Sequence, residues 1–233
     1  GAIIYVADTE NHLIREIDLD QRTVRTVAGT GSQGGPLRGR APARATALNS
    51  PWDLVKGGDR LYMAMAGAHQ IWSLDLKTSE LDLVAGSGRE DIEDGPASHS
   101  ALAQPSGLTF DGEETLYVAD SEVSAVRRIY LARREVKTLI GTGLFIFGDQ
   151  EGTFENALLQ HPLGVAYAEG IVYVADTYND KVKAIDVKNQ AISTLAGSGT
   201  EGFEDGSPGR LYEPGGLSVA GGKIYIADTN NHA

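Results

Sequence analysis

Aspartate and histidine recur along the chain at intervals that could bring several of them to one place. Five short apolar phrases recur about every 55 residues, and four of them end in Ala-Asp, at Asp8, Asp120, Asp176 and Asp228. Three histidines lie in matching phase after such phrases, at His12, His69 and His232. Carboxylates at one mouth of a ring could gather a cation, and three imidazoles around a channel would suit zinc. Both metal sites have to be weighed against simpler structural roles.

The structural role is favoured for both sets. Asp side chains stabilise turns by accepting hydrogen bonds from nearby backbone, and repeated units carry repeated residues without sharing a ligand. The second phrase has Met65-Ala66-Gly67 where the others have Asp followed by Thr or Ser, so a ring of aspartates would be broken there. We therefore predict no metal, no other cofactor and no catalytic residue. A metal-dependent lyase or hydrolase is the alternative.

A second set of residues favours binding. One position of the alternating segment after each phrase holds a long cationic or aromatic side chain, at Arg15, Trp72, Arg127 and Lys183. Trp and Arg are enriched at binding hot spots, although such side chains can also cover an edge with their stems. The loop at 141–152 carries Leu144-Phe145-Ile146-Phe147, which either plugs the core or forms an exposed patch. Phe145 and Phe147 complete the candidate set for a protein or peptide partner.

Short strands must position these residues. Each of the first four phrases is followed by a segment with period-two alternation and by a third segment after a turn, while a proline opens a further segment before each of the last four phrases. Four short antiparallel strands per unit are typical of a β-propeller blade. We expect one domain over 1–233, with blade one at 1–28 lacking its first strand. The others are blade two at 51–85, blade three at 105–140, blade four at 162–196 and partial blade five at 214–233.

The segments total seventeen strands, one more than four blades need. Two arrangements are open. In the first, residues 214–219 pair with the N-terminal strands and close a four-bladed ring. In the second, which we favour, the chain is about four blades plus one extra strand of a six-bladed ring. The open blade edges of an incomplete ring would favour a homodimer. The fold class predicted in either case is all-β, a propeller.

Composition excludes several classes of partner. The formal net charge is −12 and no run of Lys or Arg is present, so nucleic acid is not an expected partner. No stretch approaches the roughly 20 apolar residues of a membrane span, and residues 1–8 have no targeting pattern. The chain contains no cysteine, which excludes disulfides and thiolate sites. We expect a soluble chain without a membrane partner.

The phrases carry a family resemblance. Asn11-His12-Leu13 spells the name of the NHL repeat, and Ala175-Asp176-Thr177-Tyr178-Asn179 is a second copy of the pattern. The inter-blade loops share Gly-Thr/Ser-Gly, an acidic-Gly pair, Leu and Pro. This resembles the propeller of proteins that couple a thioredoxin-like domain to a six-bladed NHL ring. The resemblance implies a non-catalytic scaffold, accessory to such a domain, and slightly favours the cytoplasm.

Overall fold

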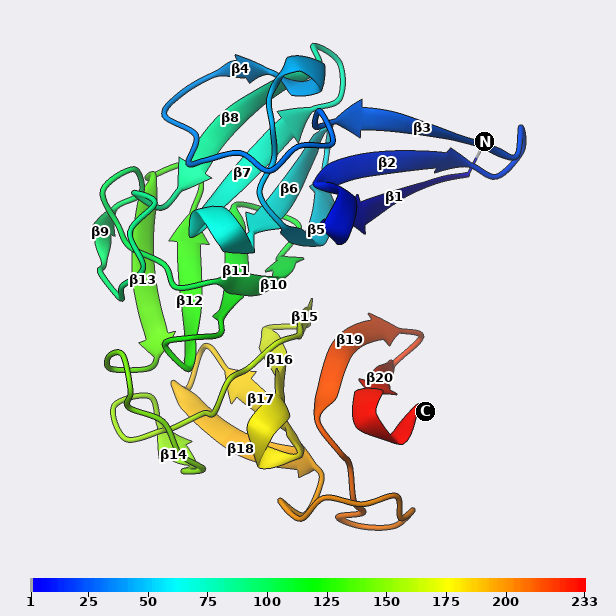
Figure 1. The fold of residues 1–233 in the computed structure, drawn as a ribbon. Helices are drawn as coiled ribbons and strands as arrows, with labels where there is room; N and C mark the ends of the chain where they lie inside the picture. The colour runs from blue at the N-terminus through cyan, green and yellow to red at the C-terminus, as the bar shows by residue number, and fades with distance from the viewer. Residues whose placement is uncertain (1) are drawn as a thin grey trace.

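Residues 2–233, which the computed structural model describes, form five antiparallel sheets in chain order (Figure 1). The first sheet contains β1 (Ile3–Asp8), β2 (Leu13–Asp18) and β3 (Thr23–Ala28). The second contains β5 (Pro51–Gly57), β6 (Arg60–Met65), β7 (Gln70–Asp75) and β8 (Glu80–Ala85). The third contains β10 (Pro105–Phe110), β11 (Thr115–Asp120), β12 (Ala125–Tyr130) and β13 (Glu135–Ile140). The fourth contains β15 (Val165–Ala168), β16 (Ile171–Asp176), β17 (Lys181–Asp186) and β18 (Ala191–Ala196), and the last contains β19 (Pro214–Ala220) and β20 (Lys223–Asp228).

These sheets confirm the all-β fold class and are of the propeller-blade type. Their strands correspond to the seventeen predicted segments, except that β15 begins at Val165 and not at Pro162. Each of the three complete sheets also gains a two-residue outer strand from the preceding loop, and these strands are β4 (Ala41–Pro42), β9 (Gly95–Pro96) and β14 (Gly152–Thr153). The sequence predicted four strands per unit because so short a strand has no periodicity. The added strand covers an otherwise free edge.

The sheets follow one another around an arc (Figure 1). Neighbouring sheets meet at their innermost strands, since β1 contacts β5, β5 contacts β10, β10 contacts β15 and β15 contacts β19. The arc begins with β1–β3 in blue and ends with β19 and β20 in orange and red. Among the described residues β19 pairs with β20 and with no N-terminal strand, so the four-bladed closure weighed above is wrong.

The core lies between neighbouring sheets. Because successive side chains of a strand point to opposite faces, each of the three complete sheets buries one face against the sheet before it and the other against the sheet after it. Ile14 of the first sheet packs with Met63 and Trp72 of the second, and Val126 of the third packs with Val174 of the fourth. All five side chains are fully buried. A blade is therefore stabilised chiefly by its neighbours.

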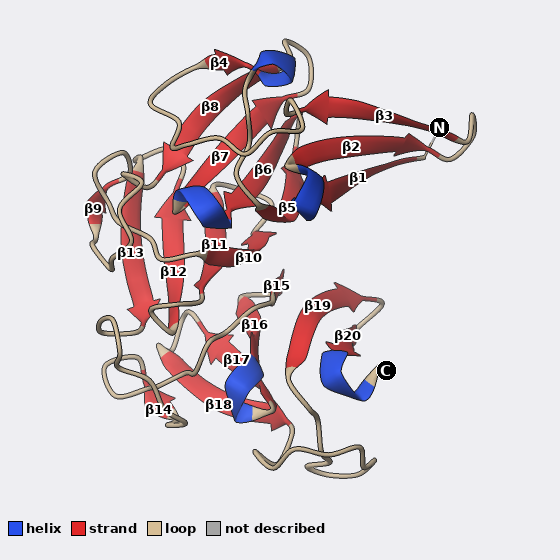
Figure 2. Cartoon of the chain, viewed as in Figure 1, coloured by secondary structure: helices blue, strands red, loops and turns tan. Residues whose placement is uncertain are grey.

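Short 3-10 turns follow four of the five phrases, as Figure 2 shows in blue against the red strands. They are η1 (Thr9–Asn11), η3 (Ala66–Ala68), η4 (Thr177–Asn179) and η5 (Thr229–Asn231), while η2 (Ala43–Ala45) lies in an inter-blade loop. Each phrase turn ends at a residue with positive φ, such as His12 at 52°. No helix among residues 2–233 has the length and hydropathy of a transmembrane segment.

Candidate functional site

The repeated aspartates hold the loops of their own blades. Asp120 and Asp176 are fully buried, and one carboxylate oxygen of each accepts a backbone hydrogen bond from the preceding loop, from Ala103 and Gln160 respectively, at 2.7 Å. Burial raises the pKa of both carboxyls, while a facing cation and these N–H groups act in the opposite direction. Asp228 accepts the same bond from Tyr212 at 2.7 Å. The hydrogen-bonding interpretation applies, although the backbone donor lies in the preceding loop and not in the following turn.

The second oxygen of each buried aspartate meets a cation from the next strand. Asp120 lies 2.8 Å from Arg127 Nη1, and Asp176 lies 2.7 Å from Lys183 Nζ, with both members of each pair fully buried. The seven-residue spacing explains the contact, because the chain turns back after the aspartate and the next strand runs beside the first. Arg127 also binds Asp94 and Lys183 binds Asp149, two acidic residues of the inter-blade loops. The cation thus joins strand and loop.

The predicted binding rim is wrong for Trp72, Arg127 and Lys183, because none of these side chains is exposed. They point between sheets and are engaged within their own blade, so they cannot contact a partner. Arg15 is partly exposed and lies 3.3 Å from Asp8. Sequence reasoning treated these residues as one row on a surface. The missed signal was that the cation always follows an aspartate by seven residues.

In blade two both the aspartate and the cation are replaced by apolar residues, which supports their pairing in the other blades. Met65 and Trp72 occupy the positions of the aspartate and the cation, and both are fully buried. The Trp72 indole N–H donates to Gln70 Oε1 at 2.8 Å, and the Gln70 side chain in turn holds the backbone of Leu37. Replacement of a buried ion pair by packed apolar side chains is often neutral or stabilising. The ion pair and the apolar pair are therefore alternative solutions to one structural task.

The residues after the aspartate tie each blade to the next. The hydroxyls of Thr9, Ser121 and Thr177 donate to the carbonyl oxygen of the proline that opens the next blade, at 2.8, 2.7 and 2.9 Å. His12 Nδ1 and His69 Nδ1 accept N–H groups from the following loop at 3.1 and 3.2 Å. The histidines thus act as inter-blade acceptors. No group of three or more His, Cys, Asp or Glu suited to a metal ion occurs among residues 2–233.

The apolar run in the loop at 141–152 was expected either to plug the core or to form an exposed patch, and the structure shows some of each. Leu144 points inward and packs against the buried cluster of Ala103, Val123 and Ala125. Phe145 is 87% exposed and Phe147 is 55% exposed, so the run forms a surface patch anchored by one inward leucine. Phe145 and Phe147 are thus the most exposed of the candidate residues, while Arg15 is only partly exposed.

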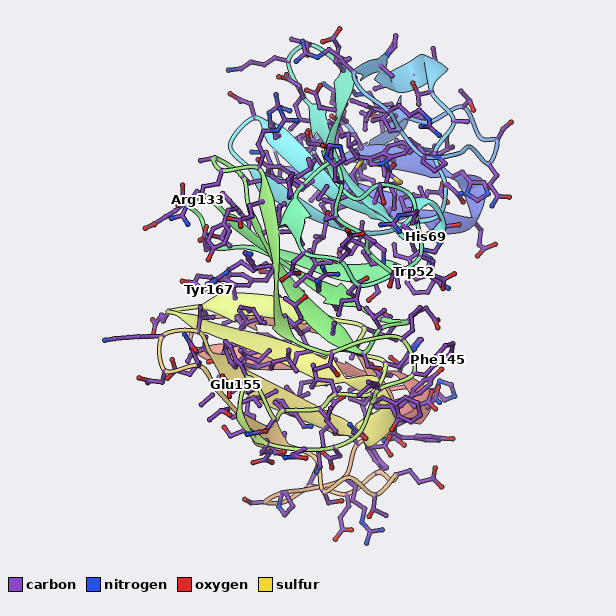
Figure 3. The ribbon with its side chains drawn as sticks, turned by 90° about the vertical axis from the view of Figure 1, so that its left-hand side faces the viewer. Trp52, His69, Arg133, Phe145, Glu155 and Tyr167 are labelled. Atoms are coloured by element: carbon purple, nitrogen blue, oxygen red, sulfur yellow. The ribbon has the colours of Figure 1, made fainter. Side chains whose placement is uncertain are left out.

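The patch borders a cavity of about 400 Å³, which we call the aromatic pocket. It is lined by Glu90, Glu122, Ser124, Leu144, Phe145, Phe147, Gln160, His161 and Tyr178. His161 and Tyr178 stack with ring centroids 4.5 Å apart and form one wall. Figure 3 shows Phe145 on the same side of the molecule as His69 and Trp52, away from Arg133 and Glu155. The pocket therefore lies on the face that carries the phrase turns.

Antiparallel sheets tied in series by one repeated phrase define a repeat protein of the β-propeller class. A model of the NHL repeat matches residues 211–233. NHL repeat-containing protein 2 of Homo sapiens is 44% identical over 265 aligned residues, which cover 99% of this chain and 36% of that protein. The chain is an NHL-repeat protein, homologous to that protein over nearly all of its own length.

A plant relative and two solved structures extend the comparison. Protein SUPPRESSOR OF QUENCHING 1, chloroplastic, of Arabidopsis thaliana is 39% identical over 98% of this chain and 23% of its own length. The chain thus spans well under half of either curated relative. An auxiliary nutrient binding protein of Bacteroides ovatus has a TM-score of 0.62 at 14% identity, covering 98% of this chain and 64% of the other. A protein of unknown function from Bacteroides thetaiotaomicron has a TM-score of 0.59 at 18% identity, over 82% and 43%. These two structures show the fold alone.

Proposed function

We propose that this chain is a non-catalytic binding module whose aromatic pocket holds a protein segment with an apolar anchor side chain and an adjacent Lys or Arg. The observation that carries the proposal is the loop run in which Leu144 is partly buried against the core while Phe145 and Phe147 project into solvent beside a cavity. Large aromatic side chains are among the most frequent hot-spot residues at protein interfaces. Their exposure has a cost in water that a partner would remove.

The loop is held in place before any partner arrives. The Gly148 N–H donates to the Leu159 carbonyl at 3.0 Å, and Asn179 Nδ2 donates to the Gly148 carbonyl at 2.8 Å. Phe145 adopts φ of +66°, which is unfavourable for a bulky residue. Strained backbone persists where surrounding contacts enforce it, and it is concentrated at functional sites. A loop fixed in this way loses little conformational entropy when a partner binds.

Charge selects the partner. Glu90 and Glu122 line the aromatic pocket, and neither forms an ion pair with another described residue. A basic side chain beside the apolar anchor would therefore be attracted, with a rate of association that falls as salt rises. The buried position of the repeated aspartates and cations supports binding over catalysis, because these groups are engaged by their own blades. The resemblance to proteins that join a thioredoxin-like domain to NHL repeats adds that the module would present its partner to such a domain.

A displayed library of random dodecapeptides selected on the 233-residue chain tests the proposal. We expect enriched sequences with an apolar residue next to Lys or Arg, and binding that weakens about 10-fold or more for Phe145→Ser, since hot-spot truncation costs about 2 kcal/mol. Phe203→Ser is the matched control, because Phe203 is 75% exposed in another inter-blade loop. Equal losses from both variants, or no enrichment of apolar-basic sequences, would refute the proposed surface.

A further inference from the structure

A second cavity lies on the inner side of the arc. Its volume is about 490 Å³, and its walls come from the innermost strands β5, β10, β15 and β19 together with η1. We call it the inner pocket. Four of its lining residues are glycines, Gly107, Gly164, Gly215 and Gly216.

The wall glycines have a steric cause. A Cβ at Gly107 would lie 2.3 Å from the carbonyl oxygen of Leu163, and one at Gly164 would lie 2.4 Å from that of Gly215. Adjacent inner strands approach too closely for any side chain at this position. Glycine there is explained by packing alone.

One blade departs from that rule. Its opening strand reads Pro51-Trp52-Asp53, whereas the corresponding position of each later blade is Gly107, Gly164 or Gly216. The pairing with β6 has a register shift between Pro51 and Asp53, like those at the start of β10 and β19, and both Trp52 and Asp53 line the inner pocket. Asp53 thus places a carboxylate where the later blades have glycine, and Trp52 places an indole where they have Ser106, Leu163 or Gly215.

Among the described residues, backbone N–H groups alone hold the Asp53 carboxylate. It accepts backbone N–H groups from Leu108 and Leu54, each at 2.7 Å, and no cationic side chain among residues 2–233 contributes to its environment. Each carboxylate oxygen has two lone pairs, so acceptor capacity remains. Trp52 is 42% exposed, an unusual state for an indole. Glu10 lines the same pocket and adds a second negative charge.

We propose that the inner pocket binds a guanidinium group, that of an arginine side chain on a peptide ligand. A guanidinium is planar, donates five N–H groups and stacks on aromatic rings, so one group can pair with Asp53 while lying on Trp52. A lysine ammonium can pair with Asp53 but stacks less well on an indole. The net charge of −12 favours approach of such a cation. The site is separate from the aromatic pocket and shares no lining residue with it.

The test compares two tripeptides, acetyl-Gly-Arg-Gly-amide and its citrulline analogue, which has nearly the same shape but no charge. The chain has two tryptophans, and Trp72 is fully buried, so the indole N–H resonance of Trp52 reports the pocket and that of Trp72 is an internal control. We expect the arginine peptide to shift the Trp52 resonance in a saturable way and to leave Trp72 unmoved. The citrulline peptide should bind at least 10-fold more weakly.

Variants separate binding from a structural role. Asp53→Asn keeps an acceptor for one backbone N–H but loses the charge, and we expect at least a 10-fold loss of arginine-peptide affinity with an unchanged fold by circular dichroism. Glu169→Gln, an exposed acidic residue in the turn between β15 and β16, is the control and should bind as the parent does. Phe145→Ser should also leave this affinity unchanged. Equal binding of arginine and citrulline, an unaffected Asp53→Asn variant, or no shift at 10 mM peptide would overturn the proposal.

Discussion

Replacing Lys183 with methionine tests the buried ion pairs that organise each blade. The Lys183 ammonium lies 2.7 Å from Asp176 and 2.8 Å from Asp149, and both Lys183 and Asp176 have no exposed side-chain surface. Methionine has nearly the same volume, so packing is kept while the charge is lost. The Asp176 carboxylate then remains buried without its cation, and breaking such a pair costs about 3–5 kcal/mol. That is a large fraction of the 5–15 kcal/mol by which domains are stable.

The double variant Asp176→Met/Lys183→Met should be less unstable than Lys183→Met alone. It copies the apolar pair Met65–Trp72 of blade two, so no unpaired charge stays buried. Its remaining penalty comes from the Gln160 N–H, which loses its acceptor at a cost of about 1–3 kcal/mol, and from the Asn179 side-chain amide, which keeps only its bond to the Gly148 carbonyl. Chemical denaturation at pH 7, followed by tryptophan fluorescence and circular dichroism, measures each free energy of unfolding.

Acid provides an independent check on the single variant. Without Lys183 the pKa of folded Asp176 rises further above its unfolded value of about 3.9. A raised carboxyl pKa favours folding below the unfolded pKa and costs stability as the pH rises through the folded pKa, so the deficit should shrink from pH 7 toward pH 4. Lys188→Met, at an exposed turn position, should stay within about 0.5 kcal/mol of the parent. A cost below 1 kcal/mol for Lys183→Met, or a double variant as unstable as the sum of the singles, would refute the reasoning.

Two further predictions concern single groups. Burial raises the pKa of Asp53 to about 6, so stability should fall as the pH rises from about 4 to 6, by up to about 3 kcal/mol, and Asp53→Asn should flatten this slope in denaturation measured across that range. A parent protein whose stability is constant over that range would contradict it. Thr177→Val removes the 2.9 Å bond to the Pro214 carbonyl and should cost about 1–3 kcal/mol, with faster amide hydrogen exchange in β19 and β20. Unchanged exchange there would show that this hydroxyl does not tie the blades.

Strand positions could be read from the sequence because the alternation is strong and the phrase recurs. The burial of Arg127 and Lys183 could not, because period two gives the face of a strand but not whether another sheet covers that face. In a sequence, Arg or Lys at a strand position looks like a residue on the protein surface. Two features of the sequence could have indicated the buried pairs. One is the seven-residue spacing between aspartate and cation, and the other is the joint change to Met65 and Trp72 in blade two.

The binding surfaces were harder to predict. An apolar run in a loop has no periodicity that gives direction, so Leu144 and Phe145 could not be assigned to opposite sides without the structure. Asp53 was visible in the sequence as the exception among glycines, but its meaning depends on the 2.3 Å approach at Gly107 that excludes side chains elsewhere. The sequence alone shows where these residues occur. Which of them are exposed, and why glycine is required elsewhere, follows only from the packing of the sheets.

The central claim is that partners bind the aromatic pocket while the repeated aspartates and cations serve only the fold. Amide hydrogen exchange of the chain with and without the tightest apolar-basic peptide from the display selection tests it most directly. The account predicts slowed exchange in the loop at 143–148 and in the turn around Tyr178, with no change in the Asp120 or Asp176 strands. Protection confined to those strands, or absent from residues 143–148, would contradict it.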